Sequence, residues 1–341
     1  MNGQPLLGIL GIVLITIVNY DAVRTTLSAS NSGPLTNRLG QGVWAFFLCL
    51  RRRLDSHRPL KVAGPCITLL LLICWVALEW LGWFLLFCSA SDAVVNSTTS
   101  VSASAWERAY FVGYTITTLG YGDLVPGAAP WQLLSIAAAV NGFFLLTLSV
   151  TYILSIVSSA SQKRQVAQAI NAMGPTPYDI IELNADEGRF ESFAQQLQSI
   201  NMTLLGLGQQ HLSYPLLHYY HSAKGDSALP LALARLDQAL AIVLFACPGI
   251  PSTARTQLLV SQAALTQFQT TLRNAFIYPA SQRPEIPDLT SYAQLPFLQK
   301  SAVAIRDHLC EQEQQRLLKA FVEKDGWKWH QVWEGDTQLK E

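Results

Sequence analysis

Two long apolar segments, residues 67–87 and 131–157, constrain this chain more than any other feature of its sequence. The first contains one charged residue, Glu79, and the second contains none. A run of about 20 apolar residues is long enough to cross the hydrocarbon core of a bilayer as a helix. The two segments therefore predict transmembrane helices, and the fold class they indicate is an all-α membrane protein.

A glycine-containing loop, Thr-Ile-Thr-Thr-Leu-Gly-Tyr-Gly-Asp, lies between these two segments. A pore that passes a dehydrated potassium ion must replace its water shell with oxygen ligands, and rings of backbone carbonyls do so without burying a net charge. Glycine adopts positive φ without steric strain, so Gly120 and Gly122 suit a loop whose successive carbonyls face one axis. We expect Thr118 to add a hydroxyl ring, Tyr121 to point away from the axis, and Asp123 to lie at the outer mouth.

The loop resembles the Thr-Val-Gly-Tyr-Gly-Asp selectivity filter of the tetrameric potassium channels, with Leu119 in place of the usual valine. The resemblance implies a homotetramer in which residues 118–122 bind the permeant ion, without a cofactor. It also implies a short re-entrant pore helix before the loop, whose carbonyl end faces the cavity and favours a cation. Ser104 and Glu107 form a capping box that predicts the start of this helix, which would run to about Thr117.

A glycine inside the second span raises a choice between two roles. Gly142 lies twenty residues after Gly122, the spacing at which similar bacterial channels have the hinge of the inner helix. A glycine inside a helix costs about 1 kcal/mol, so either a hinge or close packing would explain it. Four apolar residues follow at helical spacing and either line the pore as a hydrophobic gate or face a neighbouring subunit. They are Phe143, Leu146, Val150 and Leu154.

The N-terminal segment predicts a further span. Residues 6–18 are apolar except for Thr16, and we favour a transmembrane helix over a signal peptide because no basic region precedes them. Asp21 would lie near the inner end of this helix, paired with Arg24. Residues 24–61 are the most basic stretch of the membrane half, which the positive-inside rule places in the cytoplasm. The chain would then be multi-pass in the cell membrane, with its N-terminus outside and its C-terminus in the cytoplasm.

Three smaller features of the membrane half carry expectations of their own. Residues 35–54 predict a helix lying in the inner interface, with Arg51–Arg53 available to anionic lipid headgroups. The triplet is not interpreted as a voltage sensor, because its arginines are consecutive, whereas the arginines of a voltage sensor lie on one helix face. Glu79 either forms hydrogen bonds behind the filter or lies near the outer interface. Residues 88–104 are rich in Ser, Thr and Ala and predict a flexible outer loop.

Most of the charge follows Gln162, which indicates that a soluble, mainly helical part follows the membrane part. The division expected is an N-terminal span with a basic interfacial segment, a potassium-channel pore domain and a cytoplasmic helical domain, at 1–61, 62–161 and 162–341. The second span should extend through Met173 and stop at Gly174. Further helices are expected at 190–205, 215–222, 229–245, 252–276 and 297–323. The Gly206-Leu207-Gly208 sequence lacks a preceding strand, so no nucleotide-binding Rossmann fold is predicted.

The C-terminal half contains two groups of residues with alternative interpretations. Three histidines form either a metal or pH-sensing cluster or ordinary packing, and the second is favoured because no Cys, Asp or Glu completes a ligand set: His211, His218 and His221. Three tryptophans are interpreted as core or interface packing rather than a ligand cage: Trp327, Trp329 and Trp333. The six cysteines are scattered without metal-site or redox spacing and are interpreted as free thiols.

These patterns favour one function and leave alternatives. The leading hypothesis is a passive potassium-selective channel, gated by an unknown stimulus acting through the C-terminal domain, where an unknown cytoplasmic ligand or partner could bind. A weakly selective cation channel, which Leu119 leaves open, and a membrane receptor with a vestigial pore are the alternatives. Potassium transporter subunits usually have four degenerate filter loops, which this chain does not. No catalytic motif indicates an enzyme, and the formal net charge of zero gives no indication of a nucleic-acid partner.

Overall fold

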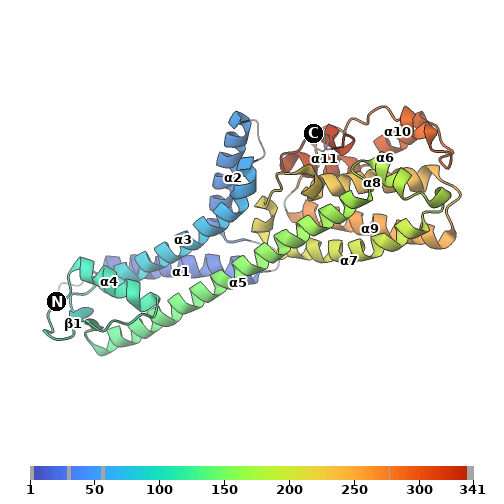
Figure 1. Ribbon diagram of the computed structural model, residues 1–341. Helices are drawn as coiled ribbons and strands as arrows, with labels where there is room; N and C mark the ends of the chain where they lie inside the picture. The colour runs from blue at the N-terminus through green and yellow to red at the C-terminus, as the bar shows by residue number, and fades with distance from the viewer. Residues whose placement is uncertain (1–3, 29–31, 55–57, 276, 336–341) are drawn as a thin grey trace. The chain divides into compact units, whose positions relative to one another are not determined.

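The protein is described by a computed structural model that covers residues 4–28, 32–54, 58–275 and 277–335 (Figure 1). The chain forms two compact units. The membrane unit comprises residues 1–42 and 65–156, and the C-terminal unit comprises residues 43–64 and 157–341. Within the described ranges both units are helical apart from one two-stranded sheet, which confirms the predicted all-α class. The first helix belongs to the same unit as the spans predicted at 67–87 and 131–157.

Three helices of the membrane half are long and apolar enough to cross a bilayer: α1 (Pro5–Leu27), α3 (Arg58–Cys88) and α5 (Ala129–Met173). Each contains one of the predicted spans. At 1.5 Å per residue, the 45 residues of α5 extend about 68 Å, more than twice the thickness of a hydrocarbon core. The helix therefore continues well beyond the membrane, as predicted, and stops at Gly174. A Cβ at Gly174 would collide with the backbone nitrogen of Ile180.

Glycines bring α1 into close contact with α3. A Cβ at Gly11 would lie 2.6 Å from the carbonyl oxygen of Gly82, and a Cβ at Gly82 would lie 2.7 Å from Ile15 Cγ1. Small residues are typical of helix contacts in membranes, where close backbone approach and packing replace the hydrophobic driving force. The opposite side of α1 exposes large apolar side chains, including Leu6, Ile9 and Ile17. This first helix is thus packed into the membrane unit.

A buried carboxylate fixes the turn from α1 to α2 (Pro34–Leu54). The predicted pairing of Asp21 with Arg24 is wrong. Arg24 instead donates to the hydroxyl of Tyr20 at 2.5 Å. Asp21 is fully buried and accepts hydrogen bonds from the Thr36 hydroxyl at 2.6 Å and the Trp75 indole at 2.9 Å. Fully buried, the carboxylate obtains its hydrogen bonds from α2 and α3.

A short antiparallel strand pair joins the two segments on either side of residues 105–123. β1 (Val94–Asn96) pairs with β2 (Leu124–Pro126), with Val95 opposite Val125. β1 lies inside residues 88–104, which were predicted to be a flexible loop without a strand. The strand was missed because its partner, β2, lies about 30 residues further along the chain. The composition of residues 88–104 carries no sign of a partner at that distance.

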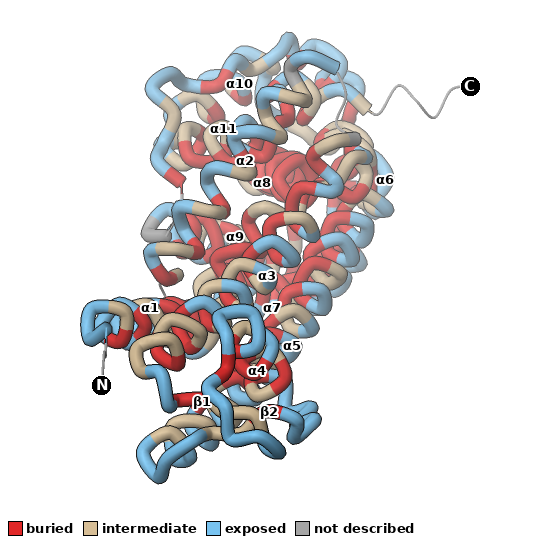
Figure 2. The backbone as a smooth tube through the Cα atoms, turned by 90° about the vertical axis from the view of Figure 1, so that its left-hand side faces the viewer, coloured by how far each residue is buried: buried red, intermediate tan, exposed pale blue. Residues whose placement is uncertain are grey.

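The C-terminal unit is a helical bundle around one buried helix, α8 (Leu229–Ala246), which Figure 2 shows in red. α8 is itself long and apolar enough to span a membrane, but 89% of its 18 residues are buried inside the protein. A helix that is apolar on all sides is either a core helix or a membrane span, and here the bundle surrounds it.

The bundle matches most of the predicted helices, with three differences. The segment expected at 297–323 forms two helices, the helix expected at 215–222 is only a short 3₁₀ helix, and α6 was not predicted. The helices are α6 (Pro177–Leu183), α7 (Glu191–Ser213), α9 (Ser252–Ala275), α10 (Ala302–Glu311) and α11 (Gln314–Lys324). Short 3₁₀ helices are η1 (Asp186–Gly188), η2 (Pro215–Tyr219), η3 (Gly225–Ser227), η4 (Thr290–Gln294) and η5 (Trp329–Val332).

Candidate functional site

The loop that carries the candidate filter follows a short, firmly capped helix, α4 (Ala105–Ile116). The Ser104 hydroxyl accepts from the Glu107 amide at 3.4 Å, and the Glu107 carboxylate accepts from the Ser104 amide at 2.7 Å. This is the predicted capping box, and it satisfies two of the amides that a helix N-terminus leaves unpaired. At the other end the Thr117 hydroxyl donates to the carbonyl of Gly113 at 2.8 Å. α4 therefore presents its carbonyl end at the start of the loop.

Residues 117–123 adopt an alternating backbone that is neither helix nor strand. φ is +60° at Thr118, +59° at Gly120 and +81° at Gly122. Positive φ is the left-handed region, which glycine enters freely and which a side chain enters only with strain. Apart from the chain neighbours of each glycine, no heavy atom of the described residues lies within 4 Å of a Cβ placed at Gly120 or Gly122. Within this chain, the dihedral angle rather than crowding is therefore what requires glycine at these positions.

Tyr121 packs against the helix behind the loop. Its ring stacks on Tyr110 at 6.0 Å between centroids with an interplanar angle of 11°, and it meets Tyr114 edge-on at 5.8 Å. The Tyr114 hydroxyl in turn donates to the carbonyl of Leu124 at 2.7 Å. The three rings and this hydrogen bond thus hold residues 121–124 against α4.

The loop is uncovered in a single chain. Every residue from Thr117 to Asp123 is exposed, including Leu119, which is 63% exposed. Exposed apolar side chains also continue along α5, among them the predicted gate residues Phe143, Val150 and Leu154, while Leu146 is half-buried. Large contiguous apolar surfaces of this kind are covered by lipid or by another protein.

Gly142 makes a close contact with the end of the pore helix. A Cβ at Gly142 would collide with the carbonyl of Ile116, the last residue of α4. Close packing against α4 is therefore what the structure shows at this position, while the hinge and the gate remain predictions.

A polar cluster links the three membrane helices near this contact. The Asn19 amide donates to Glu79 Oε2 and to Asn141 Oδ1, each at 3.2 Å, and Asn141 donates back to Asn19 Oδ1 at 2.8 Å. The Trp83 indole donates to Glu79 Oε1 at 2.8 Å. Glu79 is 1% exposed, so it is held inside the protein, and its position relative to the outer interface remains a prediction.

Sequence reasoning singled out Glu79 but missed Asn19 and Asn141. Both are strongly polar residues inside apolar segments, which is the signal that could have found them. Asn141 directly precedes Gly142, so the cluster attaches α1 to the turn of α5 that touches α4.

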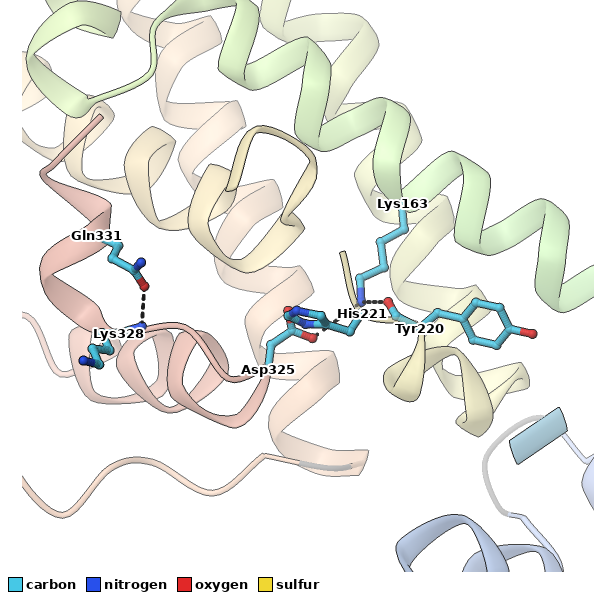
Figure 3. Close-up of polar contacts among 6 residues, drawn as sticks. All are labelled: Lys163, Tyr220, His221, Asp325, Lys328 and Gln331. Carbon is cyan, nitrogen blue, oxygen red and sulfur yellow. Dashed lines mark hydrogen bonds and ion pairs between the residues drawn. The ribbon is translucent and has the colours of Figure 1, made fainter. Parts of the chain in front are cut away.

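Beyond the membrane, α5 enters the C-terminal unit, where its side chains join a buried charged group (Figure 3). Lys163 Nζ donates to the carbonyl of Tyr220 at 2.9 Å and lies 4.0 Å from Asp325 Oδ1. His221 Nδ1 lies 3.1 Å from Asp325 Oδ2. Burial by itself raises the pKa of the Asp325 carboxyl, but the charges of His221 and Lys163 hold that pKa below its ordinary value. The group ties α5 to the end of α11.

The three histidines, for which packing was favoured over a metal or pH-sensing cluster, contact different groups. Among the residues with described positions, no group of three or more His, Cys, Asp or Glu side chains could hold a metal ion. His221 faces Asp325, and His211 Nδ1 lies 2.9 Å from the carbonyl of Leu207 in its own helix. Burial lowers the pKa of His211 and of His218 to about 3, so both are neutral at physiological pH.

Two other expectations concern the arginine triplet and the cysteines. Arg51 lies beside Gly326 in the C-terminal unit, Arg53 is exposed, and the Arg52 side chain lies outside the described part of the chain. Binding of anionic lipid at Arg51–Arg53 therefore remains a prediction. All six cysteines lie in the described ranges and are free thiols there, as predicted.

Comparison with known proteins identifies the class to which this fold and loop belong. Residues 71–159, which include α4, the loop and the first part of α5, match the family described as Ion channel. The chain belongs to this family and is a multi-pass membrane protein.

A full-length relative is the uncharacterized membrane protein YdjJ of Bacillus subtilis (strain 168). It is 32% identical over 325 residues, which cover 94% of this chain and 94% of the relative. No solved structure matches the chain.

Proposed function

We propose that the protein is a potassium-selective channel in which four copies surround one pore. The observation that carries this proposal is the alternating positive φ at Thr118, Gly120 and Gly122, directly after a capped pore helix. Such a backbone is suited to turning successive carbonyls toward one axis, where they replace the water shell of the ion. The carbonyls of residues 118–122 would select the ion, and Asp123 would lie at the outer mouth.

The incomplete surface of one chain supports the proposed tetramer. One chain supplies one filter loop, and a ring of carbonyls around an ion needs several. The exposed loop and the exposed apolar residues of α5 supply the surface that the other copies would cover. Passive permeation makes and breaks no covalent bond, so the proposal requires no catalytic group and no cofactor besides the permeant ion.

Gating would act through α5. This helix runs without interruption from Ala129, beyond the filter loop, to Met173, and its Lys163 is buried in the C-terminal unit. A conformational change in the C-terminal unit could therefore be transmitted to the pore along one continuous helix. We place the N-terminus outside and the C-terminus in the cytoplasm, because the basic residues 24–61 mark the inner side.

Ion flux into liposomes tests the proposal. The purified full-length protein should carry potassium but not sodium, and barium should block the flux. Gly122→Ala should abolish selective flux while the protein still assembles, because an alanine side chain strains the positive φ at this position. Gly206→Ala is the matched control, since Gly206 is an exposed helical glycine with no atom near its Cβ position.

The possible results separate the alternatives. Selective flux in the Gly122→Ala variant would show that the loop is not the filter. Equal sodium and potassium flux in the wild type would indicate a weakly selective cation channel instead.

A further inference from the structure

The C-terminal unit contains a cavity of about 640 Å³, which the proposed ion permeation does not use. Its walls are α6, the segment 285–292, the end of α11 and η5. Cavities of about 300–1,000 Å³ are typical of sites for small molecules. The volume therefore suits a ligand much larger than a metal ion or a water molecule.

Aromatic side chains make up much of the wall. The three C-terminal tryptophans, which the sequence suggested were packing residues, line the cavity together with two tyrosines: Tyr178, Tyr292, Trp327, Trp329 and Trp333. Tyr178 and Tyr292 meet edge-on at 5.2 Å. The Trp329 indole donates to the Glu285 carbonyl at 2.9 Å, which fixes one wall segment to another. Aromatic rings attract cations through their negative faces, most strongly when the cation is partly desolvated.

The charges of the wall favour the same kind of ligand. Four carboxylates and two ammonium groups line the cavity, which gives a formal charge of −2 when His330 is not counted: Glu285, Asp288, Glu323 and Glu334 against Lys319 and Lys328. Lys319 lies 3.8 Å from Glu323, so that pair is already neutralised. The remaining negative charge favours a positively charged ligand over an anionic one.

We propose that this cavity binds a small organic cation, a protonated amine or quaternary ammonium group with an apolar body. The rings would take the apolar body and the cationic centre, and Glu285 and Asp288 would balance its charge. This proposal does not depend on potassium selectivity, because the cavity lies wholly within the C-terminal unit.

One buried arginine joins the cavity wall to α5. Arg235 donates through Nη2 to the carbonyl of Gln331 in η5 at 3.0 Å and through Nη1 to Asn171 of α5 at 3.1 Å. Residues 328–331 form the turn at the start of η5, which is part of the cavity wall. In this turn the Lys328 amide donates to Gln331 Oε1 at 2.8 Å (Figure 3). A ligand that moves η5 would therefore act on the helix that continues from the pore.

Calorimetric titration of the full-length protein in detergent, with choline as the probe, tests the proposal. Choline should bind, and its neutral carbon isostere dimethylbutanol should bind at least about tenfold more weakly, a difference of about 1.4 kcal/mol. Glu285→Gln combined with Asp288→Asn should weaken choline binding by a similar factor. These two acids are exposed, so the change should leave folding intact.

A matched control is Asp307→Asn with Glu311→Gln, which removes two exposed acids from α10 outside the cavity. This variant should bind choline as the wild type does. Trp333→Leu supplies an independent test of the aromatic wall and should also weaken binding. The proposal is overturned if choline does not bind the wild type, if the isostere binds equally well, or if both cavity variants bind choline like the wild type, since the probe would then occupy another place such as the pore.

Discussion

Replacing Lys163 by methionine should loosen the end of α5 from the C-terminal unit. Only 7% of the Lys163 side chain is exposed, and its ammonium group meets the Tyr220 carbonyl at 2.9 Å and the Asp325 carboxylate at 4.0 Å. Methionine keeps most of the length and the apolar stem of lysine but removes both polar contacts. The variant therefore leaves Asp325, which is 3% exposed, with less compensation for its buried charge.

The size of the effect follows from the remaining partner. Removing one member of a buried ion pair destabilises a protein by about 3–5 kcal/mol. His221 stays 3.1 Å from Asp325, so we expect a loss at the lower end, about 3 kcal/mol. Domains of about 150–250 residues lose about 2–4 °C of melting temperature per kcal/mol, which predicts a decrease of about 6–12 °C.

Thermal unfolding of the full-length protein in detergent, followed by tryptophan fluorescence, measures this decrease. Arg164→Met is the matched control, since Arg164 is the next residue of the same helix and is exposed. The reasoning is refuted if Lys163→Met melts at the wild-type temperature or if Arg164→Met loses as much. A second variant, Lys163→Met with Asp325→Asn, should recover part of the loss because no charge is then left buried without its partner.

Three further predictions concern acid stability, the membrane cluster and the filter loop. His211 and His218 have a folded-state pKa of about 3 against an ordinary 6.5, so the unfolded chain binds protons first as the pH falls. The free energy of unfolding, measured between pH 7.5 and pH 5, should therefore fall by about 2 kcal/mol per histidine at pH 5. The full stabilisation should be present only above about pH 6.5. A higher free energy of unfolding at pH 5 would contradict the buried neutral state. Asn19→Leu removes the hydrogen bonds that join α1 to Glu79 and Asn141 and should destabilise the membrane unit by about 1–2 kcal/mol in thermal denaturation, whereas Thr16→Leu, on the exposed side of α1, should not. Tyr121→Leu removes the ring that stacks on Tyr110 and should raise sodium flux relative to potassium flux, while Tyr121→Phe keeps the ring and should not; equal behaviour of the two variants would exclude ring packing as the support of the loop.

The membrane half was largely predictable because its signals are local. The apolar length of residues 131–157 predicts a span, and the spacing of Ser104 and Glu107 predicts the start of α4. Glycines at alternate positions predict positive φ, and Gly120 and Gly122 have it. Each of these properties depends on residues that are neighbours in the sequence.

Pairings between distant segments were not predictable from local patterns. The strand β1 pairs with residues on the far side of the pore helix, and Ser- and Thr-rich composition gives no sign of it. Arg24 is the nearest cation to Asp21 in the sequence, yet the carboxylate turns to Thr36 and Trp75. A buried carboxylate takes the donors that the fold brings to it, and proximity along the chain does not identify them.

The sequence by itself determined the class of this protein: apolar spans of membrane length, a capped helix between two of them and a loop whose glycines permit positive φ. Only the tertiary structure decided which side chains act together. It joined Asn19 to Glu79 and Asn141, brought Lys163 to Asp325, and placed three tryptophans of a buried cluster in the wall of a cavity. The reason is physical: backbone conformation and apolar periodicity are set by neighbouring residues, whereas contacts between residues 60 to 160 positions apart depend on how whole helices pack.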